Sequence, residues 1–407
     1  MLLEFWENFR HNLFKPLLLF FYLGFFIPIL KVQFEFPFVI YQGVTMYLLL
    51  AIGWHGGEEL AAVHVSSIGQ ILGFVILGFA LNFLIGLIAY QMLTRTTKMR
   101  RIDRATVAGY YGSDSAGTFA TCIGVLTTVG MAFNGFMSVM LAVMEMPGCL
   151  VALYLAARLR HKGMDALGNM PGEPGYQPVA SVGPGAASRP ALGERLDDEH
   201  QLAIEQETEL ALELQKHPAS SVDSGDSNSG ARTVKLLREV VLNPGLYLLF
   251  GGILIGLISR LQGLKVVHDN DKVFVAAFQG VLCLFLLEMG MTAARRLKDL
   301  KTAGPGFIAF GLLAPNVFAT IGLIVAHAYA HFTHAHFEPG TYILFAVLCG
   351  AASYIAVPAV QRLAIPEASP TLPLAASLGL TFAYNVTIGI PVYIEISKLI
   401  TPCFPVT

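Results

Sequence analysis

Apolar residues along the chain gather into ten helix-length runs, and polar residues separate them. The first five runs cover residues 16–30, 37–55, 68–92, 105–126 and 134–157, and the second five cover residues 243–261, 272–294, 304–330, 340–364 and 376–399. Runs of this length are typical of helices that cross a lipid bilayer. The pattern therefore predicts an all-α integral membrane protein with ten transmembrane helices.

A long polar stretch, residues 159–236, lies between the two sets of runs. It is rich in acidic residues and in Gly, Pro and Ser, a composition that cannot bury a core. The expected organisation is one transmembrane repeat over residues 1–158, a mostly disordered linker over 159–236 and a second repeat over 237–407. Within the linker, Leu192–Lys216 has the spacing of an acidic amphipathic helix, so a docking element for a regulator is an alternative to a plain connector.

Composition agrees with a membrane protein. Of the 407 residues, 55% are hydrophobic and 13% are charged, whereas soluble domains carry about a quarter charged residues. Helix-length runs exclude an outer-membrane barrel, whose strands alternate over about ten residues. The net charge of −2 suggests no nucleic-acid partner. The five cysteines lie in or beside apolar runs without metal-ligand spacing, and the first run lacks a small-residue cleavage site, so we expect a retained span.

Basic residues predict the orientation of the chain. They gather after the third run (Arg95, Lys98, Arg100, Arg101, Arg104) and after the seventh (Arg295, Arg296, Lys298, Lys301). By the positive-inside rule these connections and the linker face the cytoplasm. The protein is then a multi-pass protein of the inner membrane with both termini outside. An external loop would hold the four histidines His327, His331, His334 and His336.

The two halves share a weak internal repeat. Gln42-Gly43-Val44 returns as Gln279-Gly280-Val281, and at the same offset Gly53 matches Gly290. The second span therefore pairs with the seventh. Five spans separate them, an odd number, so the halves have opposite orientation. A 5+5 inverted repeat with interrupted helices is typical of secondary transporters.

The fourth span contains the most unusual stretch, Gly109–Thr118, with three glycines, three hydroxyls and Asp114. An ionisable group at mid-membrane costs roughly 2.5–3.5 kcal/mol on insertion scales, so we expect a broken helix that lines an ion site. The repeat predicts a second break in the ninth span, where Gly350, Ser353 and Pro358 interrupt the apolar run. Pro358 removes a backbone donor, so the break is expected there.

Oxygen-bearing side chains near these breaks could bind a hard cation such as sodium. The predicted sodium ligands are Asp114, Ser115, Thr118, Glu145 and Asn385. Two alternatives stay open: Asp114 as a helix N-cap, and Glu145 as a hydrogen-bonded structural acid. The spans contain no Lys or Arg suited to an anion, apart from Arg362 near a cytoplasmic end. This favours a small, singly charged anion over phosphate-like ligands, which usually recruit Arg or Lys.

The chain resembles the SbtA-type family of sodium-dependent bicarbonate transporters, a family of permeases. The resemblance rests on the order and spacing of several motifs: Gly112–Phe119, Met144-Glu-Met-Pro147, Gln279-Gly-Val with Met289-Gly-Met291, and Ala352–Pro358 through Arg362 and Ile365-Pro366. The ten-span layout with a long central loop also fits. The chain departs from the family pattern in the ninth span, where a run of serines and an aspartate is replaced by Ala351-Ala352-Ser353-Tyr354.

The resemblance implies sodium-coupled uptake of bicarbonate, with Na+ as the coupling ion and no organic cofactor. It also implies an elevator-like motion of two domains, a homotrimer and, in some members, a PII-like regulator at the cytoplasmic face. The anion would lie between the two broken helices, beside Gly112, Ser113, Ser115, Ala352, Ser353 and Tyr354.

Other functions compete with this interpretation. A proton- or sodium-coupled carrier of another small anion or carboxylate and a passive anion channel both fit the same runs. An intramembrane aspartyl protease needs a second aspartate that shares a proton with Asp114, and the other aspartates lie in loops or at the ends of spans. We therefore expect a transporter and not an enzyme.

Overall fold

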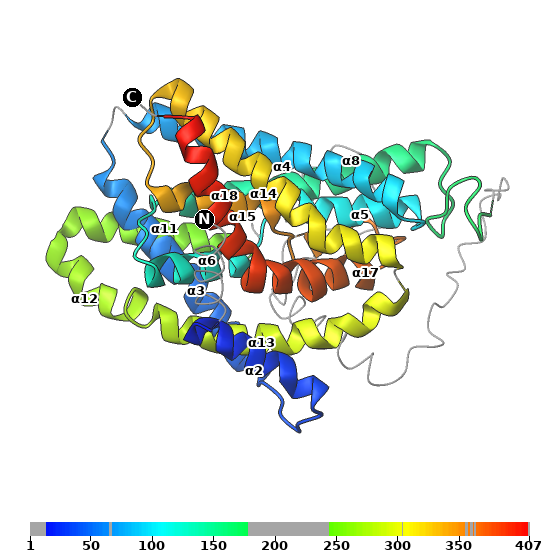
Figure 1. The fold of residues 1–407 in the computed structure, drawn as a ribbon, viewed down its shortest axis with the longest axis horizontal. Coiled ribbons are helices and arrows are strands. Elements are labelled where there is room, and N and C mark those ends of the chain that lie inside the picture. The colour runs from blue at the N-terminus through cyan, green and yellow to red at the C-terminus, as the bar shows by residue number, and fades with distance from the viewer. Residues whose placement is uncertain are drawn as a thin grey trace, which may run out of the picture.

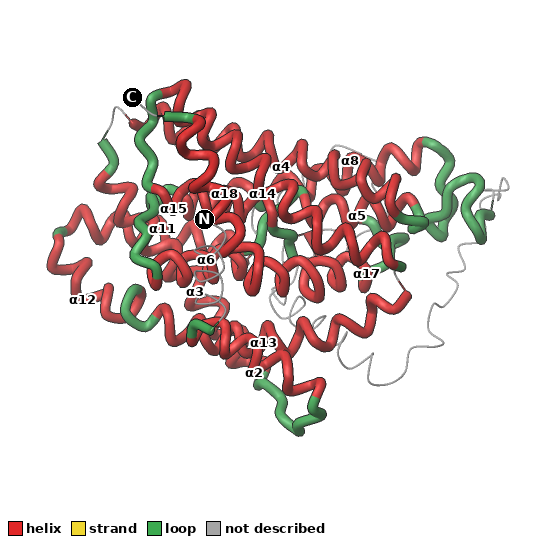
Figure 2. The backbone as a smooth tube through the Cα atoms, viewed as in Figure 1, coloured by secondary structure: helices red, strands yellow, loops and turns green. Residues whose placement is uncertain are grey.

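The computed structural model describes residues 14–64, 67–177, 244–302, 304–354, 357–358, 361 and 364–405, and over these residues every regular element is a helix (Figures 1 and 2). The first half of the chain forms α2 (Pro16–Ile29), α3 (Phe38–Ala62), α4 (Ile68–Thr96), α5 (Arg101–Tyr111), α6 (Ala116–Thr128), α7 (Met137–Met144) and α8 (Met146–His161). The second half forms α11 (Pro244–Gln262), α12 (Leu264–Phe274), α13 (Phe278–Arg296), η2 (Leu297–Thr302), α14 (Pro305–Thr333), α15 (Pro339–Gly350), α17 (Thr371–Leu374), η3 (Ala375–Phe382), η4 (Asn385–Gly389), α18 (Ile390–Ile400) and η5 (Thr401–Cys403).

Seven helical segments of the described chain are long and apolar enough to cross a membrane, and Pro16–Ile29 and Pro339–Gly350 are shorter apolar helices. The predicted run 105–126 is divided between α5 and α6, and neither piece alone is long enough to span. The predicted run 340–364 ends as a regular helix at Gly350. The fourth and ninth runs are thus interrupted as the sequence predicts, whereas α2 is short without a predicted interruption.

The helices form two groups, and each group takes helices from both halves of the sequence. The outer group consists of α2, α3, α11, α12 and α13, in which α2 packs along α13 and α3 packs along α11. The central group consists of α4–α8, α14, α15 and the segments from α17 to α18. In Figure 1, α2 and α13 lie along one edge of the molecule and α4 lies along the opposite edge.

Glycines allow the outer helices to approach closely. A Cβ atom on Gly53 of α3 would lie 2.5 Å from the Leu249 carbonyl oxygen of α11. A Cβ atom on Gly290 of α13 would overlap the Phe21 carbonyl oxygen of α2. Small residues at helix contacts are the usual basis of packing in membranes, where the lipid removes the hydrophobic driving force between helices.

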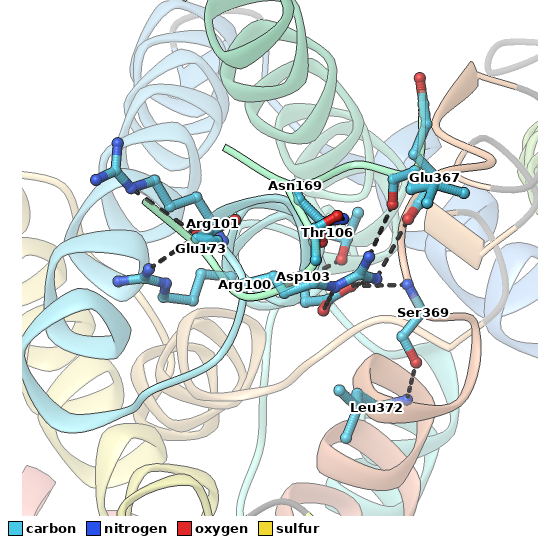
Figure 3. Close-up of polar contacts among 12 residues, drawn as sticks. Arg100, Arg101, Asp103, Thr106, Asn169, Glu173, Glu367, Ser369 and Leu372 are labelled. Atoms are coloured by element: carbon cyan, nitrogen blue, oxygen red, sulfur yellow. Dashed lines mark hydrogen bonds and ion pairs between the residues drawn. The ribbon is translucent and has the colours of Figure 1, made fainter. Parts of the chain in front are cut away.

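A polar cluster joins the basic ends of the central helices (Figure 3). The Arg100 guanidinium donates to the Asp103 carboxylate (Nε to Oδ2, 2.8 Å) and to the carbonyls of Leu167 and Glu367. Asp103 also accepts from the Ser369 N–H at 2.7 Å. These bonds tie the start of α5 to the loop after α8 and to the loop before α17.

Further ion pairs extend the same cluster. Arg160, at the end of α8, donates to the Glu367 carboxylate at 2.8 Å. Glu173 accepts from the Arg101 N–H at 2.9 Å and lies 3.8 Å from the Arg104 guanidinium. Together with the Arg100–Asp103 pair they hold one end of the central group as a unit.

The loop after α8 corrects the predicted start of the linker at residue 159. Helix α8 continues to His161, and residues 163–177 fold against the start of α5. Asp165 fixes this loop because its carboxylate accepts from the N–H groups of Leu167, Asn169 and Gln177. Burial acts to raise the pKa of Asp165, but these hydrogen bonds outweigh it and hold the pKa below its usual value. Residues 178–236 and the predicted helix Leu192–Lys216 lie outside the described residues.

The ninth run breaks after Gly350, the first of the three residues expected to interrupt it. Pro358 is itself helical, and the segment around it is described only in part. The Asn385 side chain donates to the Gly350 carbonyl at the end of α15. One further expectation differs from the structure. The predicted external histidine loop is mostly helix, because α14 runs to Thr333 and includes His327 and His331. His327 contacts the Leu323 carbonyl and the Thr401 hydroxyl, so it serves packing between helix ends.

We predict that Asp103→Ala lowers the free energy of unfolding by about 2–4 kcal/mol, because Arg100 loses its carboxylate partner and the Ser369 N–H loses its acceptor. Asp269→Ala is the matched control: Asp269 forms the same i,i+3 pair with Lys272, but its side chain is 61% exposed. The control is expected to cost less than about 0.5 kcal/mol. Unfolding in mixed micelles titrated with a denaturing detergent measures both, and equal losses would contradict the prediction.

We also predict that Gly290→Ala destabilises the protein by about 1–3 kcal/mol, since the added methyl group meets backbone that cannot move aside cheaply. Gly280→Ala lies on the same helix, and there an added Cβ has no neighbour within 4 Å. The thermal midpoint in detergent should fall for Gly290→Ala and stay unchanged for Gly280→Ala. A fall of the same size in both variants would show that α2 and α13 are not in close contact.

Candidate functional site

The first interruption separates α5 from α6 in the middle of the central group. Helix α5 ends at Tyr111, and Ser113, Asp114 and Ser115 follow with 0%, 1% and 3% of their surface exposed. Ser115 has extended backbone (φ −140°, ψ 110°), and its hydroxyl accepts from the Thr118 N–H at 3.2 Å. Ser115 is therefore the N-cap of α6. The remaining N–H groups of the first turn have no partner within the helix.

The second interruption lies beside the first. Helix α15 ends at Gly350, and residues 351–353 are not helical. The Ser353 N–H donates to the Tyr110 carbonyl at the end of α5 (2.8 Å). This hydrogen bond brings the two interruptions together, although 243 positions separate the two residues in the numbering (353 − 110). The half-helix expected after the second interruption lies in a segment that the structure describes only in part.

Several polar atoms at this junction are buried without a hydrogen-bond partner. They are both carboxylate oxygens of Asp114, the Ser353 hydroxyl and the Tyr354 hydroxyl. A buried polar group without a partner costs about 1–3 kcal/mol, and more if it is charged. The Asp114 and Glu145 carboxylates also lie close enough to interact electrostatically. The carboxylate oxygens can accept from a proton or bind a cation, whereas the two hydroxyls can also donate.

The predicted sodium ligands are only partly together in the structure. Asp114, Ser115 and Thr118 share the first turn of α6, and the Thr118 hydroxyl donates to Ser115 Oγ at 2.9 Å. Asp114 itself makes no capping hydrogen bond, so the N-cap alternative applies to Ser115. Glu145 lies beside them at the junction of α7 and α8. Asn385 already donates to the Gly350 carbonyl (2.9 Å) and accepts from the Tyr393 hydroxyl (2.6 Å).

The predicted anion ligands also divide. The Ser113 hydroxyl donates to the Glu145 carbonyl at 2.8 Å, so it fixes the junction of α7 and α8. Gly112 serves close packing, because a Cβ atom there would meet Gly86 and Gly148 at 3.0 and 3.3 Å. Ala352 is buried in the extended stretch. Three of the predicted anion ligands remain as candidates. The Ser115 hydroxyl lies at the start of α6, and the Ser353 and Tyr354 hydroxyls lie across from it.

Two contributors were missed in the sequence. Asn82 of α4 donates to the Met144 carbonyl at 3.1 Å, while its Oδ1 atom is buried without a partner. Its signal was present, as an amide in the middle of the apolar run 68–92. The other contributor is the outer group. Thr45 and Leu48 of α3 and Phe285 of α13 face the start of α6 across a small apolar cavity that Tyr354 also lines. No local pattern marks these three residues.

A known protein family matches the chain over most of its length. The family model of the Na+-dependent bicarbonate transporter superfamily matches residues 16–398, which is nearly the whole chain. A search of curated proteins finds no match to the chain. The match spans both interruptions and both helix groups.

We predict that sodium raises the thermal midpoint of the purified protein and that Asp114→Asn abolishes this effect. A ligand that binds only the folded state stabilises it by RT ln(1 + [L]/Kd), about 2.7 kcal/mol at a hundred times Kd. Choline chloride at equal ionic strength is the salt control, and Asp269→Asn, an exposed carboxylate of α12, is the variant control. Undiminished sodium stabilisation of Asp114→Asn would remove Asp114 from the cation site.

Proposed function

Because this chain belongs to the Na+-dependent bicarbonate transporter superfamily, we propose that it is a secondary transporter that couples sodium entry to the uptake of a small monovalent anion, with bicarbonate as the first candidate. The observation that carries the proposal is the buried Asp114 carboxylate, which has no hydrogen-bond partner where two interrupted helices meet. An ionisable group in this position within a membrane usually marks an ion pathway.

Sodium would bind at Asp114, with Ser115 and Thr118 as neighbouring oxygen ligands. Hard cations prefer carboxylate, hydroxyl and carbonyl oxygens, and all three kinds are present within this turn. Glu145 and Asn385 are the candidates for completing the shell or forming a second site. Asn385 would have to share its oxygen with the Tyr393 hydroxyl.

The anion would bind at the start of α6, on the N–H groups of the first turn and the Ser353 hydroxyl. A helix N-terminus favours negative charge through its unpaired donors and its dipole. The coupling follows from charge. Without a cation, the Asp114 carboxylate repels an approaching anion, and a bound sodium ion turns this repulsion into attraction. The two solutes would therefore bind together.

The arrangement of two oppositely oriented repeats, with five spans each, is part of the proposal. It is supported by the glycines that match in the sequence. Gly53 lies in the contact of α3 with α11, and Gly290 lies in the contact of α13 with α2. These contacts join the second span to the sixth and the seventh span to the first. In a 5+5 repeat the second span is equivalent to the seventh and the sixth to the first, so the two contacts are equivalent. A division into two membrane repeats joined by a linker belongs to the same proposal, with the linker beginning after residue 177.

We further propose that the polar cluster of Figure 3 faces the cytoplasm. The ends of α4 and α8 and the start of α5 carry basic residues and lie together there. Both termini would then be outside an inner membrane, and the linker would be cytoplasmic. The resemblance adds a homotrimer and a PII-like regulator at this face.

Uptake of labelled bicarbonate into proteoliposomes tests the proposal. We expect uptake that depends on an inward sodium gradient, and a Michaelis constant for the anion that rises about tenfold in Ser353→Ala, because a hydrogen bond to a charged ligand is lost. Thr94→Ala is the control, since this hydroxyl bonds within its own helix. Equal uptake with and without sodium would remove the sodium coupling.

A proton-coupled carrier is the second candidate, and the proximity of Asp114 to Glu145 favours it, because two neighbouring carboxylates can share a proton. The same vesicles distinguish the two. A pH gradient without sodium would drive uptake by the proton-coupled carrier and would leave the sodium-coupled one idle. Uptake with no gradient dependence would indicate a passive channel.

A further inference from the structure

Tyr354 is placed directly over the start of α6. Its ring packs edge-on against Phe382, with 5.9 Å between centroids and 84° between planes. Its hydroxyl reaches the first turn of α6, where a Cβ atom on Gly117 would overlap it. Gly117 therefore gives the phenol room that no other residue would leave.

The Tyr354 hydroxyl is buried and has no hydrogen bond of standard geometry within the described structure. It lies within interaction range of the Ser115 hydroxyl and the Gly117 N–H, both in the turn where the anion is proposed to bind. A phenylalanine would fill the same space without burying a polar group. The hydroxyl thus points to a ligand that it meets only when the site is loaded. The neighbouring Ser353 hydroxyl, 1% exposed as a residue, is also without a partner.

The Tyr354 ring also limits the space at this position. With Phe285 of α13 it lines the small cavity in front of Ala116 and Gly117. A Cβ atom on Gly117 would lie 2.8 Å from the Phe285 ring, so both rings border the same point. One ring belongs to the central group and the other to the outer group, and between them they leave little volume beside the α6 amides.

We propose that Tyr354 determines the size of the transported anion. It donates a hydrogen bond to an oxygen of the bound anion, and its ring occupies the volume that a longer carboxylate would need. The expected ligands are planar oxyanions with a single central carbon, such as bicarbonate and formate. Acetate, lactate and pyruvate, with their additional carbons, are excluded. This inference rests on the proposed function and assigns the selectivity of that site.

Two substitutions separate the hydrogen bond donated by the Tyr354 hydroxyl from the size limit set by its ring. Tyr354→Phe removes the hydroxyl and keeps the ring, so the Michaelis constant for bicarbonate should rise roughly ten- to a hundredfold while the maximal rate and the exclusion of acetate persist. Tyr354→Ser opens the site, so acetate and lactate should compete with labelled bicarbonate at least tenfold better than in the unmodified protein.

The matched control is Tyr384→Phe, which removes a phenol that donates to the Asn316 side chain of α14 at 2.8 Å. It should change neither the Michaelis constant nor the competition. Gel filtration in detergent checks that each variant is folded, and if Tyr354→Ser fails this check, Tyr354→Phe alone decides the donor role.

The outcomes distinguish this inference from the proposed function. If the unmodified protein takes up no bicarbonate under any gradient, the proposed function fails. If it does take up bicarbonate, but Tyr354→Phe and Tyr354→Ser keep its Michaelis constant and its anion selectivity, only the role of Tyr354 is overturned. A reduced maximal rate with unchanged affinity and selectivity would also overturn it, because that result indicates a structural role.

Discussion

The hydrogen bond from the Ser353 N–H to the Tyr110 carbonyl is the contact on which the central site depends. Ser353 belongs to backbone that has left the helix, and Tyr110 lies in the last turn of α5, whose carbonyls have no partner within the helix. Backbone polar groups buried in an apolar helix group must find a partner within the protein, because neither lipid nor bulk water supplies one. The hydrogen bond gives each of these two groups its partner, while both Asp114 carboxylate oxygens stay buried without one.

Ion pairs stabilise the central group around this junction, whereas few polar bonds join it to the outer group. The central group is held by the Arg100–Asp103 and Arg160–Glu367 pairs at one end. Its contact with the outer group includes only a few polar bonds in the described chain, such as Ser138 to the Ile52 carbonyl (2.9 Å) and Gln279 to the Gly124 carbonyl (3.1 Å). The two groups also meet through helix packing, as between α13 and η3.

The sequence predicted the helical class and the first interruption well, because glycines, hydroxyls and a carboxylate in an apolar run leave few other solutions. It named Gly350, Ser353 and Pro358 together for the second interruption, and α15 ends at the first of them. The hydrogen bond from Asn385 to the Gly350 carbonyl comes from a distant part of the chain, so no local pattern shows it. The outer-group residues Thr45 and Phe285 could not be predicted either. Each sits in an ordinary apolar run, and only tertiary packing brings them to the site.

The attachment of the linker has a mechanical consequence. On one side, residues 163–177 are hydrogen-bonded to the start of α5, so the chain stays with the central group up to residue 177. On the other side it re-enters at Pro244, the first residue of α11 in the outer group. Residues 178–243 therefore connect the two helix groups covalently. The contour length of this connection sets an upper limit on the separation between the loop after α8 and the start of α11.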